Sequence, residues 1–124
     1  MNVVDSSGWL EYFAGGRNAA RFAGPLKDTA SLIVPSVCIY EVFKVLLRES
    51  GENAALQAAS AMQRGTLVDL TPALAMSAAS LSLEHDLPMA DSIILASARA
   101  YEATVWTQDV HFKSIEGVKY FQKK

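Results

Sequence analysis

The sequence predicts an α/β fold, a three-layer α/β/α sandwich with a central, mainly parallel sheet of four or five strands. Three observations support this prediction: short apolar runs with β-forming residues recur along the chain, stretches of helical length separate them, and Gly or Pro stands at most junctions. Such βαβ units build a parallel sheet with helices on both faces. The 124 residues, 51% of them hydrophobic, suffice for one domain, residues 1–124, with a core of its own.

The N-terminal part of the chain predicts one strand and two helices. Residues 2–5 form the first strand, and the polar side chains at its end cap a helix through residues 9–13, which Gly15 stops. A second, short helix is expected over residues 18–22 and ends near Pro25. These elements make up the first crossover.

The middle of the chain predicts a second strand and two longer helices. The β-rich residues 32–34 form the strand, which Pro35 closes. Ser36 caps a long helix that runs to about residue 49, and an Ala-rich helix follows over residues 51–64.

The C-terminal half predicts three strands and two helices. Strands are expected at residues 67–70, 104–107 and 118–121. A proline opens each of the two helices, residues 72–84 and 88–102. In sheets of this kind ligands bind beyond the carboxyl ends of the strands, where the strand order reverses, so the residues that follow each strand are the candidates for function.

The charge balance limits how the protein could bind nucleic acid. The formal net charge is −2, from 11 basic and 13 acidic side chains. Binding by bulk electrostatic attraction normally needs a basic excess or a basic stripe. A site that handles phosphate would therefore need a local cation, such as a divalent metal ion.

The sequence also argues against disulfides, thiolate zinc and a membrane location. Cys38 is the single cysteine and lies in an apolar run. The apolar runs are far shorter than the ~20 residues of a membrane span. The N-terminus has neither the basic start nor the apolar stretch of a secretory signal. We therefore expect a cytoplasmic protein.

Four acidic residues lie where an acid is expected either to have a function or to be unfavourable for stability. Asp5 follows the first strand and Asp109 follows the fourth, while Glu41 and Asp91 lie within apolar helical sequence. Carboxylates do not stay ionised in apolar surroundings without compensation. If the four converge at one edge of the sheet, a hard cation such as Mg²⁺ or Mn²⁺ would offset their repulsion.

Each acid also has a purely structural interpretation. Asp5 and Asp109 could cap a helix or a turn, which is as good an explanation as metal ligation for either one. Glu41 precedes Lys44 and Arg48 by three and seven residues, so an ion pair on a solvated helix face is the better explanation of Glu41 taken alone.

Asp91 favours function more than the others. The helix macrodipole favours an acid in the first turn of a helix, which is its structural interpretation. However, its neighbours at i+3 and i+4, Ile94 and Leu95, are apolar. The joint placement of the four acids, more than any single one, supports a metal site.

Several other enzyme classes are excluded by missing motifs. The chain has no Gly-x-x-x-x-Gly-Lys loop, no His-Glu-x-x-His pair and no Gly-x-Ser-x-Gly elbow. His85 and His111 fall in turn regions and are interpreted as surface histidines. Dehalogenase-like phosphatases need a second acid where Ser7 stands, and receiver domains need an acid at the end of the third strand, whereas Asp69 is expected inside it. These two classes remain as poor enzyme alternatives.

Four blocks in order carry a resemblance to a known family. They read VVDSS (3–7), VPSVCIYEV (34–42), LPMADSIILA (87–96) and VWTQDVHF (105–112). Together they resemble the PIN-domain family, and within it the VapC-type toxin ribonucleases of bacterial toxin–antitoxin pairs, over nearly the whole chain. One departure is that many relatives have a further acid three to five residues after the Asp of the third block. Ile, Leu and Ala fill that window here, which argues against a tightly held second metal.

The resemblance implies an endoribonuclease that hydrolyses single-stranded RNA or RNA loops with Mg²⁺ or Mn²⁺, leaving a 5′-phosphate and a 3′-hydroxyl. The catalytic and metal-binding residues that carry over are Asp5, Glu41, Asp91 and Asp109. Asp5 and Asp91 are expected to lie closest to the metal, and the other two to act partly through water. Ser6 and Thr107 would orient carboxylates or water, or else serve only as hydroxyls at a helix cap and a strand end.

The resemblance also implies partners. A VapB-type antitoxin protein would neutralise the toxin, and the nearly all-apolar helix over residues 37–47 favours a homodimer and a groove for an antitoxin helix. The alternative function is a catalytically weak PIN-like module that acts as a complex-forming regulatory subunit of a toxin–antitoxin operon. The presence of all four acids favours catalysis.

Overall fold

Five short parallel strands form the centre of the molecule. The computed structural model describes all residues, 1–124. The strands are β1 (Asn2–Val4), β2 (Ile33–Pro35), β3 (Thr66–Val68), β4 (Thr104–Thr107) and β5 (Val118–Tyr120). They form a three-stranded ladder, β1-β4-β5, and a two-stranded one, β2-β3, and the single bridge between Asn2 and Leu32 joins the two. The order across the sheet is therefore β5-β4-β1-β2-β3, and every pairing is parallel.

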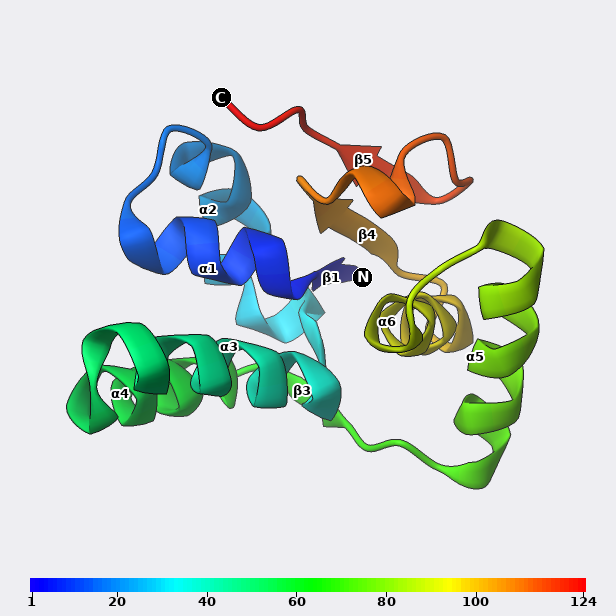
Figure 1. The fold of residues 1–124 in the computed structure, drawn as a ribbon, viewed down its shortest axis with the longest axis horizontal. Coiled ribbons are helices and arrows are strands. Elements are labelled where there is room, and N and C mark those ends of the chain that lie inside the picture. The colour runs from blue at the N-terminus through cyan, green and yellow to red at the C-terminus, as the bar shows by residue number, and fades with distance from the viewer.

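Six α-helices cover the two faces of this sheet. They are α1 (Ser6–Ala14), α2 (Ala19–Lys27), α3 (Ser36–Ser50), α4 (Glu52–Met62), α5 (Pro72–His85) and α6 (Met89–Ala100). Short 3₁₀ turns span Thr29–Ser31 and Val110–Phe112. Figure 1 shows α1 to α4 on one side of the strands and α5 and α6 on the other. The predicted α/β class is confirmed, and no helix has the length and apolar character needed to cross a membrane.

The strand order reverses at the centre of the sheet. From β1 the chain goes through α1 and α2 to β2 and then to β3 on one side, and it returns through α5 and α6 to β4 on the other side of β1. In parallel sheets the crevice at such a reversal is where ligands bind, beyond the carboxyl ends of the strands. Here that position lies at the ends of β1 and β4.

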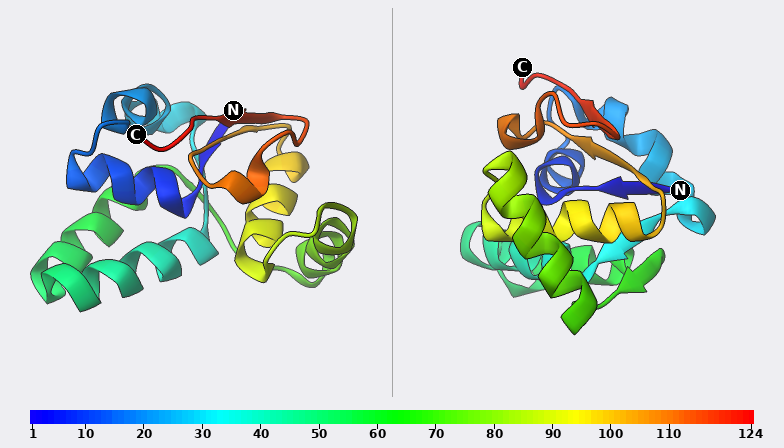
Figure 2. Two further views of the ribbon diagram at one scale, coloured as in Figure 1. Left: turned by 45° about the horizontal axis from the view of Figure 1, so that its top comes forward. Right: turned by 90° about the vertical axis from the view of Figure 1, so that its right-hand side faces the viewer.

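Helix α6 is the most buried helix of the molecule. Its eight consecutive residues Asp91–Ala98 are all buried. The helix packs against α5, α3 and the strands β1, β2 and β4 (Figure 2). A helix with no solvent-facing side over two turns explains why Asp91 stands out in the sequence as an acid in apolar surroundings.

Three local predictions are wrong. Helix α2 continues past Pro25 to Lys27, because Phe22, Pro25 and Leu26 form one buried face that packing keeps helical. Ser36 is the first residue of α3 and makes no capping hydrogen bond, since Pro35 occupies the cap position. Strand β3 ends at Val68, so Asp69 follows the strand instead of lying inside it.

Candidate metal centre

Asp5 lies at the carboxyl end of β1 and is only 1% exposed. One carboxylate oxygen, Oδ1, accepts hydrogen bonds from Ser7 Oγ at 2.7 Å and from the Gly8 amide at 3.0 Å. The other, Oδ2, accepts one from Thr107 Oγ1 at 2.7 Å. Burial raises the pKa of Asp5 to about 6, although these hydrogen bonds favour the ionised form. The helix-cap interpretation of Asp5 is confirmed, and the cap sits at the reversal of the strand order.

Thr107 joins the ends of the two central strands. It is the last residue of β4 and is fully buried. Its hydroxyl donates to Asp5 across the sheet and accepts from the Asp109 amide at 2.8 Å. The Thr107 side chain therefore fixes the position of the Asp5 carboxylate relative to the Asp109 amide.

Asp109 and His111 form the turn that follows β4. The Oδ1 atom of Asp109 accepts a hydrogen bond from the His111 amide at 2.9 Å and thereby caps the 3₁₀ turn. The same oxygen lies 2.7 Å from His111 Nδ1. The cap interpretation of Asp109 is confirmed, and the turn brings the imidazole back over the carboxylate.

Asp91 enters the site from the first turn of α6. It is 8% exposed, and neither of its carboxylate oxygens accepts a hydrogen bond from a protein donor. Its nearest cationic group is His111, whose Nδ1 lies 3.6 Å from Asp91 Oδ2. Burial, followed by the negative charges of Asp109, Asp5 and Glu41, raises the pKa of Asp91 to about 7.

Glu41 approaches from α3 and is half-buried. Ser6 Oγ donates to Glu41 Oε1 at 2.6 Å, which ties α3 to the start of α1. The predicted ion pair with Lys44 or Arg48 is wrong. Arg48 pairs with Glu49 at 3.5 Å, and Lys44 Nζ lies 5.6 Å from the ring centre of Tyr40.

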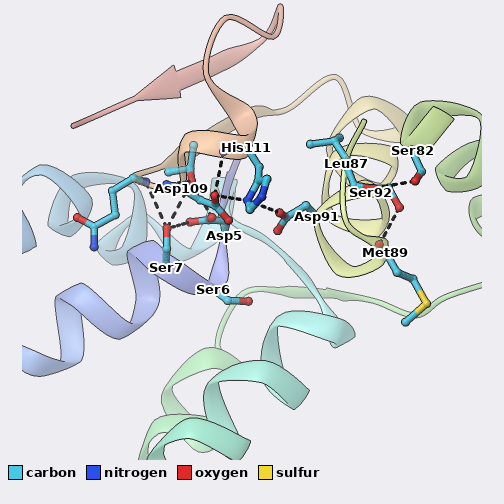
Figure 3. A network of polar contacts seen from close by, with 12 residues as sticks. Asp5, Ser6, Ser7, Ser82, Leu87, Met89, Asp91, Ser92, Asp109 and His111 are labelled. Carbon is cyan, nitrogen blue, oxygen red and sulfur yellow. Dashed lines mark hydrogen bonds and ion pairs between the residues drawn. The ribbon is translucent and has the colours of Figure 1, made fainter. Parts of the chain in front are cut away.

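The structure thus brings the four predicted acids to one end of the sheet. In Figure 3 the side chains of Asp5, Asp91, Asp109 and His111 point toward one another. Asp91, Asp109 and His111 each offer one atom that could bind a metal ion, and these three atoms lie within 4.8 Å of one another. Clustered carboxylates, one of them buried without a hydrogen-bond donor, suit a cation with oxygen or mixed oxygen and nitrogen ligands. A divalent metal therefore fits these residues.

The sequence matches one family model over most of its length. A model of the PIN domain covers residues 3–118. The chain belongs to the PIN domain family.

Solved structures with the same fold come from several bacteria. A toxin–antitoxin complex from Klebsiella pneumoniae has a TM-score of 0.84 and 18% identity, over 98% of this chain and 99% of that chain. VapC20 from Mycobacterium tuberculosis, a Sarcin-Ricin loop cleaving toxin, has a TM-score of 0.72 and 19% identity, over 86% and 87%. VapBC2 from Rickettsia felis, bound to a promoter DNA fragment, has a TM-score of 0.74 and 14% identity, over 99% and 98%. No curated protein sequence matches the chain.

Two polar residues of this PIN-domain site are missed by the sequence analysis. Ser7 is given no role in the site by its sequence position, yet its hydroxyl donates to Asp5 and accepts from the Gln108 amide at 3.2 Å. His111 is interpreted as a surface histidine, and its side chain is indeed 51% exposed, but its Nδ1 lies beside two carboxylates. The two-residue spacing of Asp109 and His111 after a strand is the signal that could have indicated the second.

Proposed function

We propose that this PIN domain is a metal-dependent endoribonuclease toxin that hydrolyses RNA phosphodiester bonds and is neutralised by a cognate antitoxin. The observation that carries the proposal is the meeting of four acids from β1, α3, α6 and the end of β4, with Asp91 buried and lacking a hydrogen-bond donor. Membership of the PIN domain family supports it. The toxin–antitoxin complexes among the structures of the same fold support the toxin assignment.

In this proposal the four acids hold a metal ion and two hydroxyl residues position them. A bound Mg²⁺ or Mn²⁺ would lower the pKa of a water molecule and stabilise charge on the scissile phosphate. Asp5 and Asp91 would lie closest to the ion, and Glu41 and Asp109 would hold it partly through water. The catalytic set is thus Asp5, Glu41, Asp91 and Asp109. Ser6 and Thr107 position it, since their hydroxyls donate to Glu41 and Asp5.

A groove beside the site suits an antitoxin segment. A hollow of about 700 Å³ lies between α1, α3 and α4. Apolar side chains such as Leu10, Phe13 and Leu46 line it, and the acids Glu11 and Glu49 stand among them. An amphipathic helix with apolar and basic residues matches this lining. The groove also reaches Ser7, so an antitoxin bound there would approach the metal centre.

The exposed face of α3 suits a second copy of the chain. Tyr40 is 58% exposed and Leu47 is 46% exposed. Together with Ile39 and Phe43 they line a shallow apolar hollow. We assign this face to a homodimer, and we assign the protein to the cytoplasm, where its RNA substrates are.

Cleavage of RNA by purified protein tests the proposal. We expect the wild-type protein to cut single-stranded RNA with Mg²⁺ or Mn²⁺, to stop in EDTA and to leave a 5′-phosphate. Asp91→Asn should lower the rate by about a hundredfold or more, because it removes a ligand. The control Asp69→Asn changes an exposed acid outside the site and should keep the wild-type rate. Cleavage that persists in EDTA or in Asp91→Asn would contradict the nuclease assignment.

Expression in cells tests the toxin assignment. Induction of the wild-type protein should stop growth, whereas Asp5→Asn should not, and co-expression of the neighbouring small gene should restore growth. Equal growth of both strains with intact cellular RNA would support the regulatory-subunit alternative.

A further inference from the structure

We propose that His111 is itself a ligand of the metal held by Asp91 and Asp109, and that its nitrogen makes the site prefer Mn²⁺ to Mg²⁺. This inference rests on the proposed metal-dependent function. It adds a residue to the site and specifies which class of divalent ion the site selects.

The geometry around His111 is that of a ligand set. Its Nδ1 lies 2.7 Å from Asp109 Oδ1 and 3.6 Å from Asp91 Oδ2. In an octahedral complex with metal–ligand bonds near 2.1 Å, neighbouring donor atoms lie about 3 Å apart. The three atoms therefore need only small shifts to occupy adjacent positions around one ion.

The turn after β4 places His111 beside the site, and its ring nitrogen contacts the Asp109 carboxylate. The Asp109 carboxylate accepts from the His111 amide at 2.9 Å, and the next residue, Phe112, is fully buried and anchors the turn in the core. A surface histidine without a role would be free to turn toward solvent. Here the ring faces the carboxylates (Figure 3), and its Nε2 makes no hydrogen bond or ion pair within the protein.

The chemistry of the imidazole permits ligation through Nδ1. Nδ1 lies at hydrogen-bond distance from Asp109 Oδ1, and since a carboxylate only accepts, this contact places the imidazole proton on Nδ1. A bound cation would replace this hydrogen bond: with the proton moved to Nε2, the neutral imidazole presents a lone pair on Nδ1, the atom next to both carboxylates. Asp5 and Glu41 add negative charge to the site, which favours a cation. The ligand set then contains one nitrogen and several oxygens.

Helix α6 carries no further acid in the turn after Asp91. Ile94, Leu95 and Ala96, one turn after Asp91, are 0%, 1% and 3% exposed and belong to the core. No carboxylate can therefore reach the ion from that part of α6. His111 is the remaining side chain with a donor atom beside both Asp91 and Asp109.

A nitrogen ligand changes which ion binds best. Oxygen ligands suit Mg²⁺ and Mn²⁺ alike, whereas imidazole favours transition metals over Mg²⁺. Removing the nitrogen should thus weaken Mn²⁺ binding much more than Mg²⁺ binding. A residue that only oriented Asp109 would affect both ions equally.

Calorimetry with each ion and pulsed electron paramagnetic resonance of bound Mn²⁺ test the inference together. We expect wild-type protein to bind Mn²⁺ more tightly than Mg²⁺ and its bound Mn²⁺ to show modulation from a nitrogen nucleus. His111→Ala should weaken Mn²⁺ binding by about tenfold or more, change Mg²⁺ binding far less, and abolish the nitrogen modulation. His85→Ala, a histidine outside the site, should leave all three measurements unchanged.

The outcomes separate this inference from the proposed function. Asp91→Asn should abolish uptake of both ions, and if it binds them as the wild type does, the proposed metal site itself is wrong. If Asp91→Asn fails to bind but His111→Ala keeps the wild-type ion preference and the nitrogen signal, only the role of His111 is overturned. Circular dichroism of each variant establishes that it is folded.

Discussion

The carboxylate of Asp5 serves the fold and the candidate site at once. It caps α1 through the Gly8 amide and is joined to β4 through Thr107. These contacts use both oxygens, yet burial still raises its pKa. The pKa of this carboxyl is raised although both of its oxygens accept hydrogen bonds. No cationic side chain of the protein compensates its negative charge, so the position suits a bound cation.

The raised pKa of Asp5 makes stability depend on pH. Its pKa is raised from 3.8 to about 6, so between these values the folded protein holds a proton that the unfolded chain has released. The stabilisation is complete below about pH 4 and is lost as the pH rises through about 6. In EDTA we expect the free energy of unfolding, measured with urea, to fall by up to about 3 kcal/mol over this window from Asp5 alone.

Two variants and a metal ion check this expectation. Asp5→Asn removes one of two titrating groups and should make the pH dependence shallower, with the remaining part coming from Asp91, whose pKa is also raised. The exposed Asp69→Asn should keep the wild-type slope. Adding Mn²⁺ near pH 8 should restore stability, because the ion binds the ionised carboxylates. Identical slopes in the wild type and Asp5→Asn would show that the Asp5 carboxyl is not perturbed by folding.

At the level of residues, the sequence predicts where the acids of the site lie better than it predicts which polar side chains contact them. Asp5 and Asp109 follow strands, so topology alone predicts that they meet at one edge of a parallel sheet. The contacts of Ser7 and His111 depend on the path of the turn after β4, which no periodicity in the sequence encodes. The ligand roles of all these residues stay predictions until metal binding is measured.

At the level of elements, apolar runs locate the strands well. Strand β4 has the predicted bounds, and the others differ by one or two residues at an end. The predicted end of α2 near Pro25 is wrong for a physical reason. A proline normally ends a helix, but Pro25 is part of a buried helix face in the folded chain. Local sequence signals fail where tertiary packing outweighs them.

Helix α1 can lie against β1 only because residue 8 is a glycine. A Cβ added at Gly8 would lie 2.5 Å from Val4 Cγ1 and 2.9 Å from the Phe22 ring, and both side chains are fully buried. We expect Gly8→Ala to lower the free energy of unfolding by about 1–3 kcal/mol in urea denaturation, because α1 must move away from the strand. Nuclease activity should fall with it, since Asp5 caps this helix.

Gly24 of α2 provides the matched control. A Cβ there would meet nothing within 4 Å. Helix propensity favours Ala over Gly while the following proline disfavours it, so Gly24→Ala should change stability by less than about 1 kcal/mol. A Gly8→Ala protein as stable as Gly24→Ala would show that the packing of α1 on β1 is looser than the structure indicates.

At the level of the whole molecule, the fold class follows from the alternation of strands and helices, but the surfaces that meet partners do not. The groove between α1, α3 and α4 is built from side chains of separate segments. The sequence shows only that each of these helices has more apolar residues than one buried face requires. An apolar helix face can belong to a core, a dimer or a partner site. Only the assembled structure shows which apolar side chains stay exposed.

The exposed face of α3 leads to a prediction about assembly. We expect the wild-type protein at micromolar concentration to scatter light as a particle of twice the 13.4 kDa chain. Tyr40→Glu should yield the monomer, because it places a charge in the apolar contact. The control Leu56→Glu alters an apolar residue on α4 that is 50% exposed and should leave the dimer intact. A wild-type monomer would contradict the homodimer.

The pairing of β1 with β4 joins residues 2–4 to residues 104–106. The candidate site therefore depends on segments that lie about 100 residues apart in the sequence. During translation the nascent chain cannot complete this site until β4 and Asp109 have left the ribosome. Under the proposed function, the chain is inactive until that point, and an antitoxin that is already present can bind it as soon as the site forms.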